Sequence, residues 1–321
     1  MKKLLTMIVA LIMILSLAAC VGSPAPTGST NQTAKPTQTA GNSDGNTDHS
    51  EPTKPAETTT PSAPAETEPT EPAKPVPPTV EMKTVYVQTL MKQTHRVDGE
   101  ITYEISVIKV YDENGLMIKC IYDYGEEGGI LEMNAENDQY GRVIRLTGTQ
   151  DGQTTTIDYT YDEVGNTLSI ISALDGAVVQ EQFYTYDSDG NMLSHEILYA
   201  GSLVSKTVYV YEQGRMVKRE HYNENGELSQ YSDFIYDEAG RIVTQEIRLE
   251  NGALWANSLY TYSEDGLTTY TNCEKYRLST VEVKDENGNL VRTESIDAGG
   301  SSVVEYTYLE IQVPEDYPRK N

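Results

Sequence analysis

"YDEAGRIVTQEIRLENGALWANSLYTYSEDG", residues 236–266, contains two runs in which polar and apolar residues alternate, each followed by a cluster that includes glycine. In the first run Val243 and Ile247 share one face, and in the second run Tyr260 and Tyr262 share another. Alternation with a period of two is typical of a half-buried β-strand. The stretch therefore predicts two antiparallel strands joined by a tight turn.

The cluster Tyr-Asp-x-x-Gly that opens this stretch has the composition of a hairpin corner. Tyr236 has high β-propensity and ends the incoming strand. The side chain of Asp237 can accept hydrogen bonds from backbone N–H groups further along the turn, and Gly240 can adopt the positive φ that reverses the chain. The acidic residue is thereby explained by turn chemistry without a ligand.

Imperfect copies of this cluster recur along the chain with a period of about 25 residues. Their first-residue spacings are 26, 24, 25, 25, 25, 26 and 22 residues, and the copies are YDENG (111), NDQYG (137), YDEVG (161), YDSDG (186), YEQG (211), YDEAG (236), YSEDG (262) and KDENG (284). A second turn signal, such as Asp175-Gly176 or Asn251-Gly252, lies between most copies. These patterns predict an all-β fold, an antiparallel β-meander of about eight hairpin repeats that forms a twisted open or spiralling sheet.

A Tyr-x-Tyr pattern ends one strand of most repeats, and its members point to one face because they are two residues apart. Stacked repeats should carry these rings in ladders with a step of about 9 to 10 Å, since each repeat adds two strands. Exposed rings would offer stacking platforms for sugars, whereas packed rings would be structural. The candidate binding residues are Tyr159, Tyr184, Tyr209 and Tyr260.

The N-terminal sequence "MKKLLTMIVALIMILSLAAC" has the basic, apolar and small-residue regions of a secretory signal. Its end, Leu17-Ala18-Ala19-Cys20, resembles the lipobox of bacterial lipoproteins. The resemblance implies a signal peptide over 1–19, cleavage before Cys20, and lipid on its sulfur that anchors the protein to the outer face of a membrane. An ordinary signal peptide with a chance cysteine is the alternative.

Composition divides the remainder at residue 80. Residues 21–80 hold twelve of the fourteen prolines and no aromatic residue, so they cannot bury enough apolar surface to fold. We expect 20–80 to be a lipidated cysteine followed by a semi-extended tether. All 23 tyrosines lie beyond residue 80, and 81–321 is predicted to be the β domain.

The formal net charge is −25, and loss of Lys2 and Lys3 with the signal peptide makes it −27. This charge makes nucleic acid an improbable partner. It permits a cationic partner or bound calcium, but a solubilising acidic surface is the favoured explanation. Cys120 and Cys273 lie six repeats apart in the predicted open sheet and are expected to be separate, partly buried thiols.

The residues that carry chemistry are sparse. His195 and His221 can share a face in adjacent repeats, but that places them about 9 to 10 Å apart, too far for one metal ion. "DSDGN" (187–191) and "DENGN" (285–289) have the oxygen-rich spacing of a calcium loop without its flanking helices or its glutamate, so turn chemistry explains them better. We expect no enzyme activity, no metal and no cofactor.

Residues 236–266 also resemble a unit of the YD-repeat, or Rhs, family, in which Tyr-Asp-x-x-Gly-Arg, strand, x-x-Gly, strand and Tyr-x-Tyr-Asp follow one another. Similar units stand at 161–190 and 186–214, and the pattern covers most of 100–310. The resemblance implies long sheets that spiral into shells around toxins or are displayed on cell surfaces. This chain lacks the Asp-Pro-x-Gly processing motif, so it is more similar to short YD-repeat surface lipoproteins.

The sequence thus predicts a lipid-anchored cell-surface binding or scaffold protein without catalysis, with a carbohydrate or protein ligand and no nucleic-acid partner. The alternative is an envelope hydrolase or a shell component of an Rhs-type toxin system.

Overall fold

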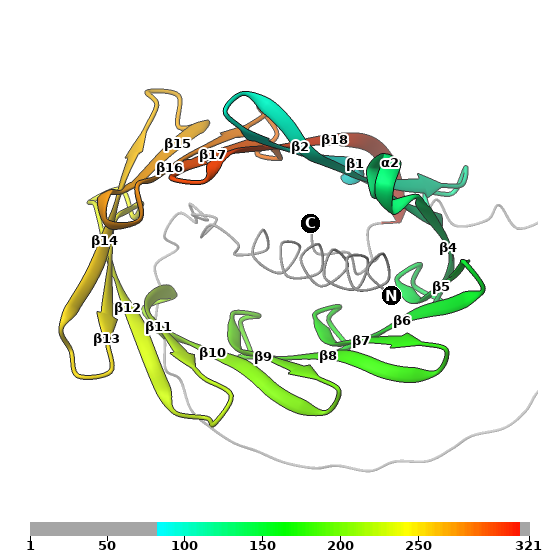
Figure 1. Ribbon diagram of the computed structural model, residues 1–321, viewed down its shortest axis with the longest axis horizontal. Helices are drawn as coiled ribbons and strands as arrows, with labels where there is room; N and C mark the ends of the chain where they lie inside the picture. Colours follow the sequence, from blue (N-terminus) through cyan, green and yellow to red (C-terminus); the bar gives the residue numbers. More distant parts are fainter. Residues whose placement is uncertain (1–81, 315–321) are drawn as a thin grey trace, which may run out of the picture. The chain divides into compact units, whose positions relative to one another are not determined.

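The computed structural model of this protein describes residues 82–314, which form a single antiparallel sheet of 18 strands (Figure 1). The predicted signal peptide, Cys20 and the predicted tether lie outside the described residues, as does the end of the chain after 314. The strands are β1 (Met82–Val97), β2 (Glu100–Tyr111), β3 (Met117–Asp123), β4 (Ile130–Asn137), β5 (Val143–Gln150), β6 (Gln153–Tyr161), β7 (Thr167–Leu174), β8 (Ala177–Tyr186), β9 (Met192–Tyr199), β10 (Ser202–Glu212), β11 (Arg215–Tyr222), β12 (Leu228–Tyr236), β13 (Ile242–Leu249), β14 (Leu254–Tyr262), β15 (Thr268–Cys273), β16 (Leu278–Lys284), β17 (Leu290–Asp297) and β18 (Gly300–Pro314).

Helical structure in the described part of the chain is confined to two short turns, α2 (Gly125–Gly128) and the 3₁₀ turn η1 (Glu274–Tyr276). Within residues 82–314, no helix is long and apolar enough to cross a membrane. The prediction of an all-β antiparallel meander is therefore confirmed.

The sheet closes on itself, because β1 pairs with β2 along one side and with β18 along the other. The β1–β18 register includes Met91 opposite Tyr306 and Thr94 opposite Val303. The prediction of an open or spiralling sheet is wrong for this reason. Closure pairs the backbone donors and acceptors that would otherwise remain exposed at the first and last strands.

The eight Tyr-Asp-x-x-Gly copies occupy the turns that follow the even-numbered strands, from the β2–β3 turn to the β16–β17 turn. The repeat is therefore confirmed. At the β12–β13 corner the carboxylate of Asp237 accepts hydrogen bonds from the backbone N–H of Arg241 (2.8 Å) and from its Nε (2.8 Å). The backbone hydrogen bond from Arg241 is the largest of the interactions that lower the pKa of Asp237. The residue after the glycine thus completes the corner by binding the aspartate.

The tyrosine that ends the strand, which is the second tyrosine wherever Tyr-x-Tyr is present, has a structural task at five positions. There its hydroxyl donates a hydrogen bond to a backbone carbonyl of a neighbouring repeat, 18 to 23 residues earlier in the chain. The pairs are Tyr111 to Gln88 (3.3 Å), Tyr161 to Val143 (2.7 Å), Tyr236 to Met216 (2.6 Å), Tyr262 to Ile242 (2.8 Å) and Tyr308 to Leu290 (2.9 Å). This bond explains why tyrosine and not phenylalanine stands at the position.

We expect Tyr236→Phe to lower the free energy of unfolding by about 1 kcal/mol, because it removes one hydrogen bond and leaves the Met216 carbonyl without that donor. Denaturant unfolding would measure the change. Tyr270→Phe is the matched control, since Tyr270 is 47% exposed on β15 and its substitution should leave stability within about 0.5 kcal/mol. Equal effects of the two changes would contradict a structural role for the Tyr236 hydroxyl.

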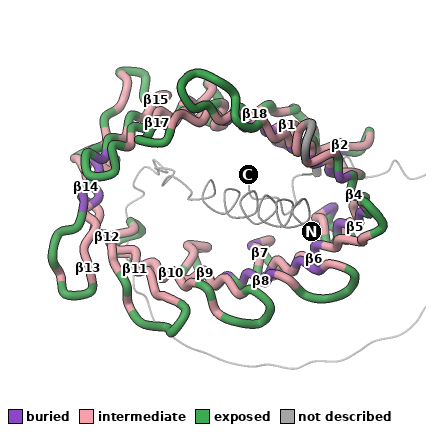
Figure 2. Tube along the Cα trace, in the orientation of Figure 1, coloured by how far each residue is buried: buried purple, intermediate pink, exposed green. Residues whose placement is uncertain are grey.

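The largest buried cluster is formed by residues of β1 to β6 and β18 that share the inward face of the paired strands. Figure 2 shows buried stretches of the tube along several of these strands. Its members come from alternate positions of neighbouring strands, as the period of two predicts. They are Met91, Val107, Met117, Cys120, Tyr122, Leu131, Met133, Leu146, Ile157 and Val304. An 18-stranded barrel is too wide for side chains alone to fill, so this cluster covers one part of the wall.

The outer face carries ion pairs around much of the barrel. They join residues of the same or neighbouring strands: Lys92–Glu104, Lys119–Glu132, Arg145–Asp158, Lys206–Glu196, Arg248–Asp233 and Arg292–Glu294. Each pair is partly exposed and contributes little to stability. Their placement puts these six carboxylates on the outer face of the barrel.

Cys120 and Cys273 form no disulfide, as predicted. Both are 2% exposed, so the expectation of partial burial is corrected to full burial. They occupy inward positions of β3 and β15, where burial raises the pKa of the Cys120 thiol.

Candidate functional site

Polar and aromatic side chains line the inner face of strands β8 to β14, on a different part of the wall from the apolar cluster. Cross-strand pairs define one row, Tyr184 opposite His195, His195 opposite Thr207, and Thr207 opposite His221. A parallel row contains Tyr209 opposite Arg219 and Arg219 opposite Ser232. We call this surface the inner polar strip; it consists of Gln180, Gln182, Tyr184, His195, Thr207, Tyr209, Arg219, His221, Ser232, Phe234, Gln245 and Tyr260.

The four candidate tyrosines all occupy inward positions of the closed barrel. Tyr159 lies beside the apolar cluster, whereas Tyr184, Tyr209 and Tyr260 belong to the inner polar strip. Tyr184 is 7% exposed and the other three are half-buried. The rings therefore line the interior of the barrel, because closure turned the face that carries them inward.

A hydrogen-bonded node surrounds Gln182. Its Oε1 accepts from the Tyr184 hydroxyl (2.8 Å) and lies 3.0 Å from Nε2 of His195. The Tyr184 and His195 rings stack with centroids 4.6 Å apart and planes 2° apart, and burial lowers the pKa of His195. The imidazole is therefore neutral at pH 7.

The same node leaves polar atoms without partners. Gln182 and Gln180 are only 1% and 3% exposed. Gln182 Nε2 and Gln180 Oε1 are buried and have no hydrogen-bond partner within the described part of the chain. Turning the Gln182 amide over would only exchange which end is unpaired. One donor and one acceptor at adjacent inward positions can bind a ligand hydroxyl, which offers both functions.

A second node, at β12–β14, shows the contrasting case in which a glutamine is satisfied. Gln245 Nε2 donates to Ser232 Oγ (2.9 Å), and the Tyr260 hydroxyl donates to Gln245 Oε1 (3.0 Å). Burial raises the pKa of Tyr260, so its hydroxyl stays protonated. The two nodes present hydroxyl and amide groups along the interior.

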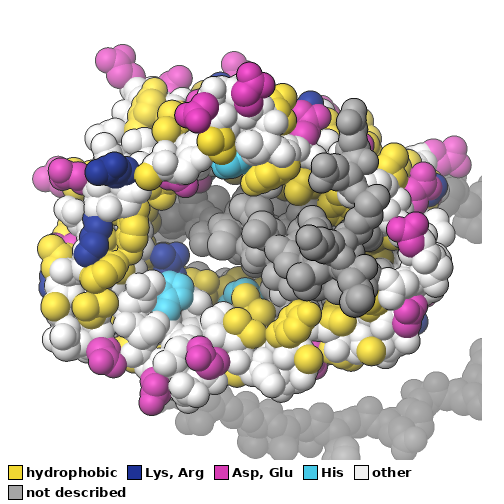
Figure 3. Space-filling view, viewed as in Figure 1, with side chains coloured by type: hydrophobic (Ala, Val, Ile, Leu, Met, Phe, Trp, Pro, Cys, Tyr) yellow, Lys and Arg dark blue, Asp and Glu magenta, His cyan; other side chains and the backbone are white. Residues whose placement is uncertain are grey.

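Arg219 and His221 lie between these nodes on β11. His221 Nδ1 is 3.1 Å from the Thr207 hydroxyl, and burial together with the charge of Arg219 lowers the pKa of His221 to about 4. The inward positions of the described strands β8–β14 hold no carboxylate. Glu181, Glu196, Asp233 and Glu246 occupy the alternate positions of these strands, which face outward. Figure 3 accordingly shows histidine side chains facing the interior and acidic side chains mainly around the outer edge.

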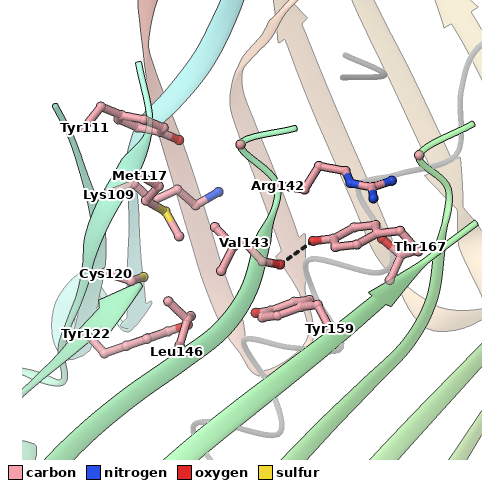
Figure 4. Close-up of a pocket in the computed structure, with 13 residues that line it drawn as sticks. Lys109, Tyr111, Met117, Cys120, Tyr122, Arg142, Val143, Leu146, Tyr159 and Thr167 are labelled. Atoms are coloured by element: carbon pink, nitrogen blue, oxygen red, sulfur yellow. Dashed lines mark hydrogen bonds between the residues drawn. The ribbon is translucent and has the colours of Figure 1, made fainter. Parts of the chain in front are cut away.

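A pocket of about 330 Å³ lies beside the apolar cluster, at β2–β7. Figure 4 shows Cys120, Tyr122, Leu146 and Tyr159 gathered along it, with a hydrogen bond to the Val143 carbonyl at its edge. Lys109 and Arg142 are its basic residues, and no acidic residue lines it among those described. Arg142 is already paired with Asp138 at 2.6 Å.

The calcium-like loops use their oxygens internally. Asp187 Oδ1 accepts from the backbone N–H groups of Asp189 (2.9 Å) and Asn191 (2.8 Å), and its Oδ2 accepts from Asn191 Nδ2 (2.8 Å). Asp285 is bound in the same way by Asn287 and Asn289. Over residues 82–314, no group of three or more His, Cys, Asp or Glu side chains is arranged to hold a metal ion.

The sequence pattern identified the tyrosines but missed Gln180, Gln182 and Arg219. A signal for the glutamines was available, because they alternate with Tyr184 in "AVVQEQFYTY" and must share its face. The same signal was available for Arg219, because it is two residues from His221 in "RMVKREHY" and must share its face.

No protein-family model and no curated protein sequence matches this chain. Among solved structures, it is similar to TcdB2-TccC3-Cdc42, at 12% identity and a TM-score of 0.36 over 70% of this chain. The match spans 15% of that chain. It is also similar to a porin-like protein from Bacteroides uniformis ATCC 8492, at 9% identity and a TM-score of 0.38, covering 69% of this chain and 98% of that one.

A further porin-like protein, from Bacteroides vulgatus ATCC 8482, matches at 12% identity and a TM-score of 0.28, covering 70% of this chain and 99% of that one. With TM-scores below 0.5, these similarities assign the chain to neither group. The likeness to YD repeats therefore remains one of sequence pattern, and function has to be argued from the inner polar strip.

Proposed function

We propose that this protein is a non-catalytic binding protein of the bacterial envelope, whose barrel accepts a glycan chain along the inner polar strip. The observation that carries the proposal is the unpaired donor and acceptor at Gln182 and Gln180, buried beside the ring of Tyr184. A buried amide without a partner is costly, and a hydroxyl-rich ligand would satisfy both groups.

The composition of the inner polar strip supports a glycan over an apolar ligand. Serine, threonine, glutamine and tyrosine side chains can bind sugar hydroxyls, and the rings of Tyr209, Phe234 and Tyr260 can pack against the apolar faces of sugar rings. Inward positions on β8–β14 carry no carboxylate, and the inward carboxylate of Glu282 lies on β16, where it contributes to raising the pKa of Tyr260.

Isothermal titration calorimetry of the full chain against cell-wall and plant glycans tests this function. We expect Tyr260→Ala to weaken binding by about tenfold or more, because it removes both a ring and the donor to Gln245. Tyr270→Ala on the adjacent strand is the control, since Tyr270 pairs with Thr261 on the outer face and is 47% exposed. Absence of binding to every glycan, or equal losses in the two variants, would reject the proposal.

The proposed location is the outer side of a membrane, held there by lipid on Cys20. The lipobox-like sequence Leu17-Ala18-Ala19-Cys20 supports this proposal. Cys20→Ala should release the protein into the medium in cell fractionation, and continued retention by the membrane would refute lipid anchoring.

A further inference from the structure

Arg219 is the basic side chain at the centre of the inner polar strip. It lies on β11 between Tyr209 of β10 and Ser232 of β12, and its guanidinium lies 5.8 Å from the centroid of the Phe234 ring. Its positive charge contributes to lowering the pKa of His221 and opposes the rise in the pKa of Tyr260. Arg219 therefore acts electrostatically on both neighbouring parts of the strip.

Arg219 has no anionic partner among residues 82–314. No carboxylate forms an ion pair with it, and its Nε is buried with no hydrogen-bond acceptor. Five other arginines, by contrast, are paired with carboxylates: Arg142, Arg145, Arg241, Arg248 and Arg292. The chain contains 49 acidic residues, so the lack of a carboxylate at Arg219 does not reflect a shortage of acids.

An unpaired arginine in a partly desolvated wall is unfavourable unless something supplies the missing charge. Aspartate or glutamate at Thr207, Ser232 or His221 would have done so, and these positions instead hold neutral groups. His221 is itself uncharged near neutral pH because its pKa is about 4. The site has the form of a cationic fork surrounded by hydroxyl and imidazole groups, with the anion to come from outside the protein.

We propose that Arg219 binds an oxyanion of the ligand, so that the preferred ligand is an acidic glycan whose sugar hydroxyls bind the neighbouring groups of the strip. Guanidinium matches carboxylate and phosphate oxygens in two-pronged geometry, and both groups occur on acidic glycans. This inference rests on the proposed glycan-binding function and specifies its charge.

The test compares polygalacturonate with its methyl ester, which has the same backbone without the charge, by calorimetry with the full chain. We expect the acid form to bind about tenfold or more tightly, and Arg219→Gln to remove that preference. Arg292→Gln makes the same change in net charge on the outer face, where Arg292 pairs with Glu294, and should retain the preference. Poly(glycerol phosphate) is the third probe and distinguishes a phosphate from a carboxylate as the preferred anion.

The outcomes separate this inference from the proposed function. If both forms of the glycan bind equally, or if Arg219→Gln retains the preference, the role of Arg219 is refuted while glycan binding stands. If none of the probes or other glycans binds, both are refuted. Arg219→Lys keeps the positive charge but lacks the two-pronged guanidinium, so it should lose part of the preference for the acid form. If the substituted chains do not fold, the affinities of the wild-type chain for polygalacturonate and for its methyl ester decide the question. Equal affinities would then overturn the inference.

Discussion

Ile157→Ala is expected to lower the free energy of unfolding by about 2–5 kcal/mol. Ile157 is 0% exposed on β6, where it pairs with Leu146 on one side and Ser172 on the other. Removing three carbons there loses their transfer free energy and leaves a cavity that the flanking strands cannot close. Denaturant unfolding followed by circular dichroism would measure the loss.

Ile235→Ala is the matched control for this prediction. The same substitution is made here on the outer face of β12, where Ile235 is 47% exposed and pairs with Thr244. Its truncation should change the free energy of unfolding by about 0.5 kcal/mol or less. A small effect at Ile157 would show that the inner cluster does not stabilise the barrel.

A disulfide across the closing seam should form nearly completely in the double variant Thr94→Cys, Val303→Cys. These two residues are direct partners between β1 and β18, and paired residues of antiparallel strands lie within disulfide range. In an open sheet of 18 strands, the same residues would lie about 80 Å apart at 4.8 Å per strand. Non-reducing electrophoresis would detect the crosslink, and the bond should stabilise the fold by about 2–4 kcal/mol.

Thr94→Cys with Lys206→Cys provides the control for the seam, because Lys206 lies on β10 and pairs with β9 and β11 rather than β1. Both pairs are best made in the Cys20→Ala background; Cys120 and Cys273 are buried and can remain. A crosslink in the control, or none in the seam variant, would argue against the observed closure.

Local chemistry made the hairpins predictable. The 25-residue period, the Asp-to-Gly corners and the alternation around Tyr260 each concern residues close in sequence, and the structure confirms all three. The role of the second tyrosine was less accessible, because the carbonyl that accepts from Tyr236 lies 20 residues away at Met216. Only the pairing of successive repeats brings that acceptor within reach.

The candidate site was predictable in part for the same reason. Tyrosines two residues apart had to share a face, but the sequence could not decide whether that face would lie outside or inside. Gln182, His195 and Arg219 come from three different strands, and bulges in β9–β10 and β10–β11 shift the register between them. Their assembly into one strip therefore depends on pairings that no local pattern encodes.

By itself, the sequence determined the strands, the corners and the face on which the tyrosines stand, because these follow from side-chain alternation and turn chemistry over a few residues. The tertiary structure alone decided that β1 would pair with β18, more than 200 residues away in sequence, and so whether the tyrosines would face an open surface or an enclosed one. The physical reason is that closure depends on the twist and register accumulated over all 18 strands, to which each repeat contributes a small part.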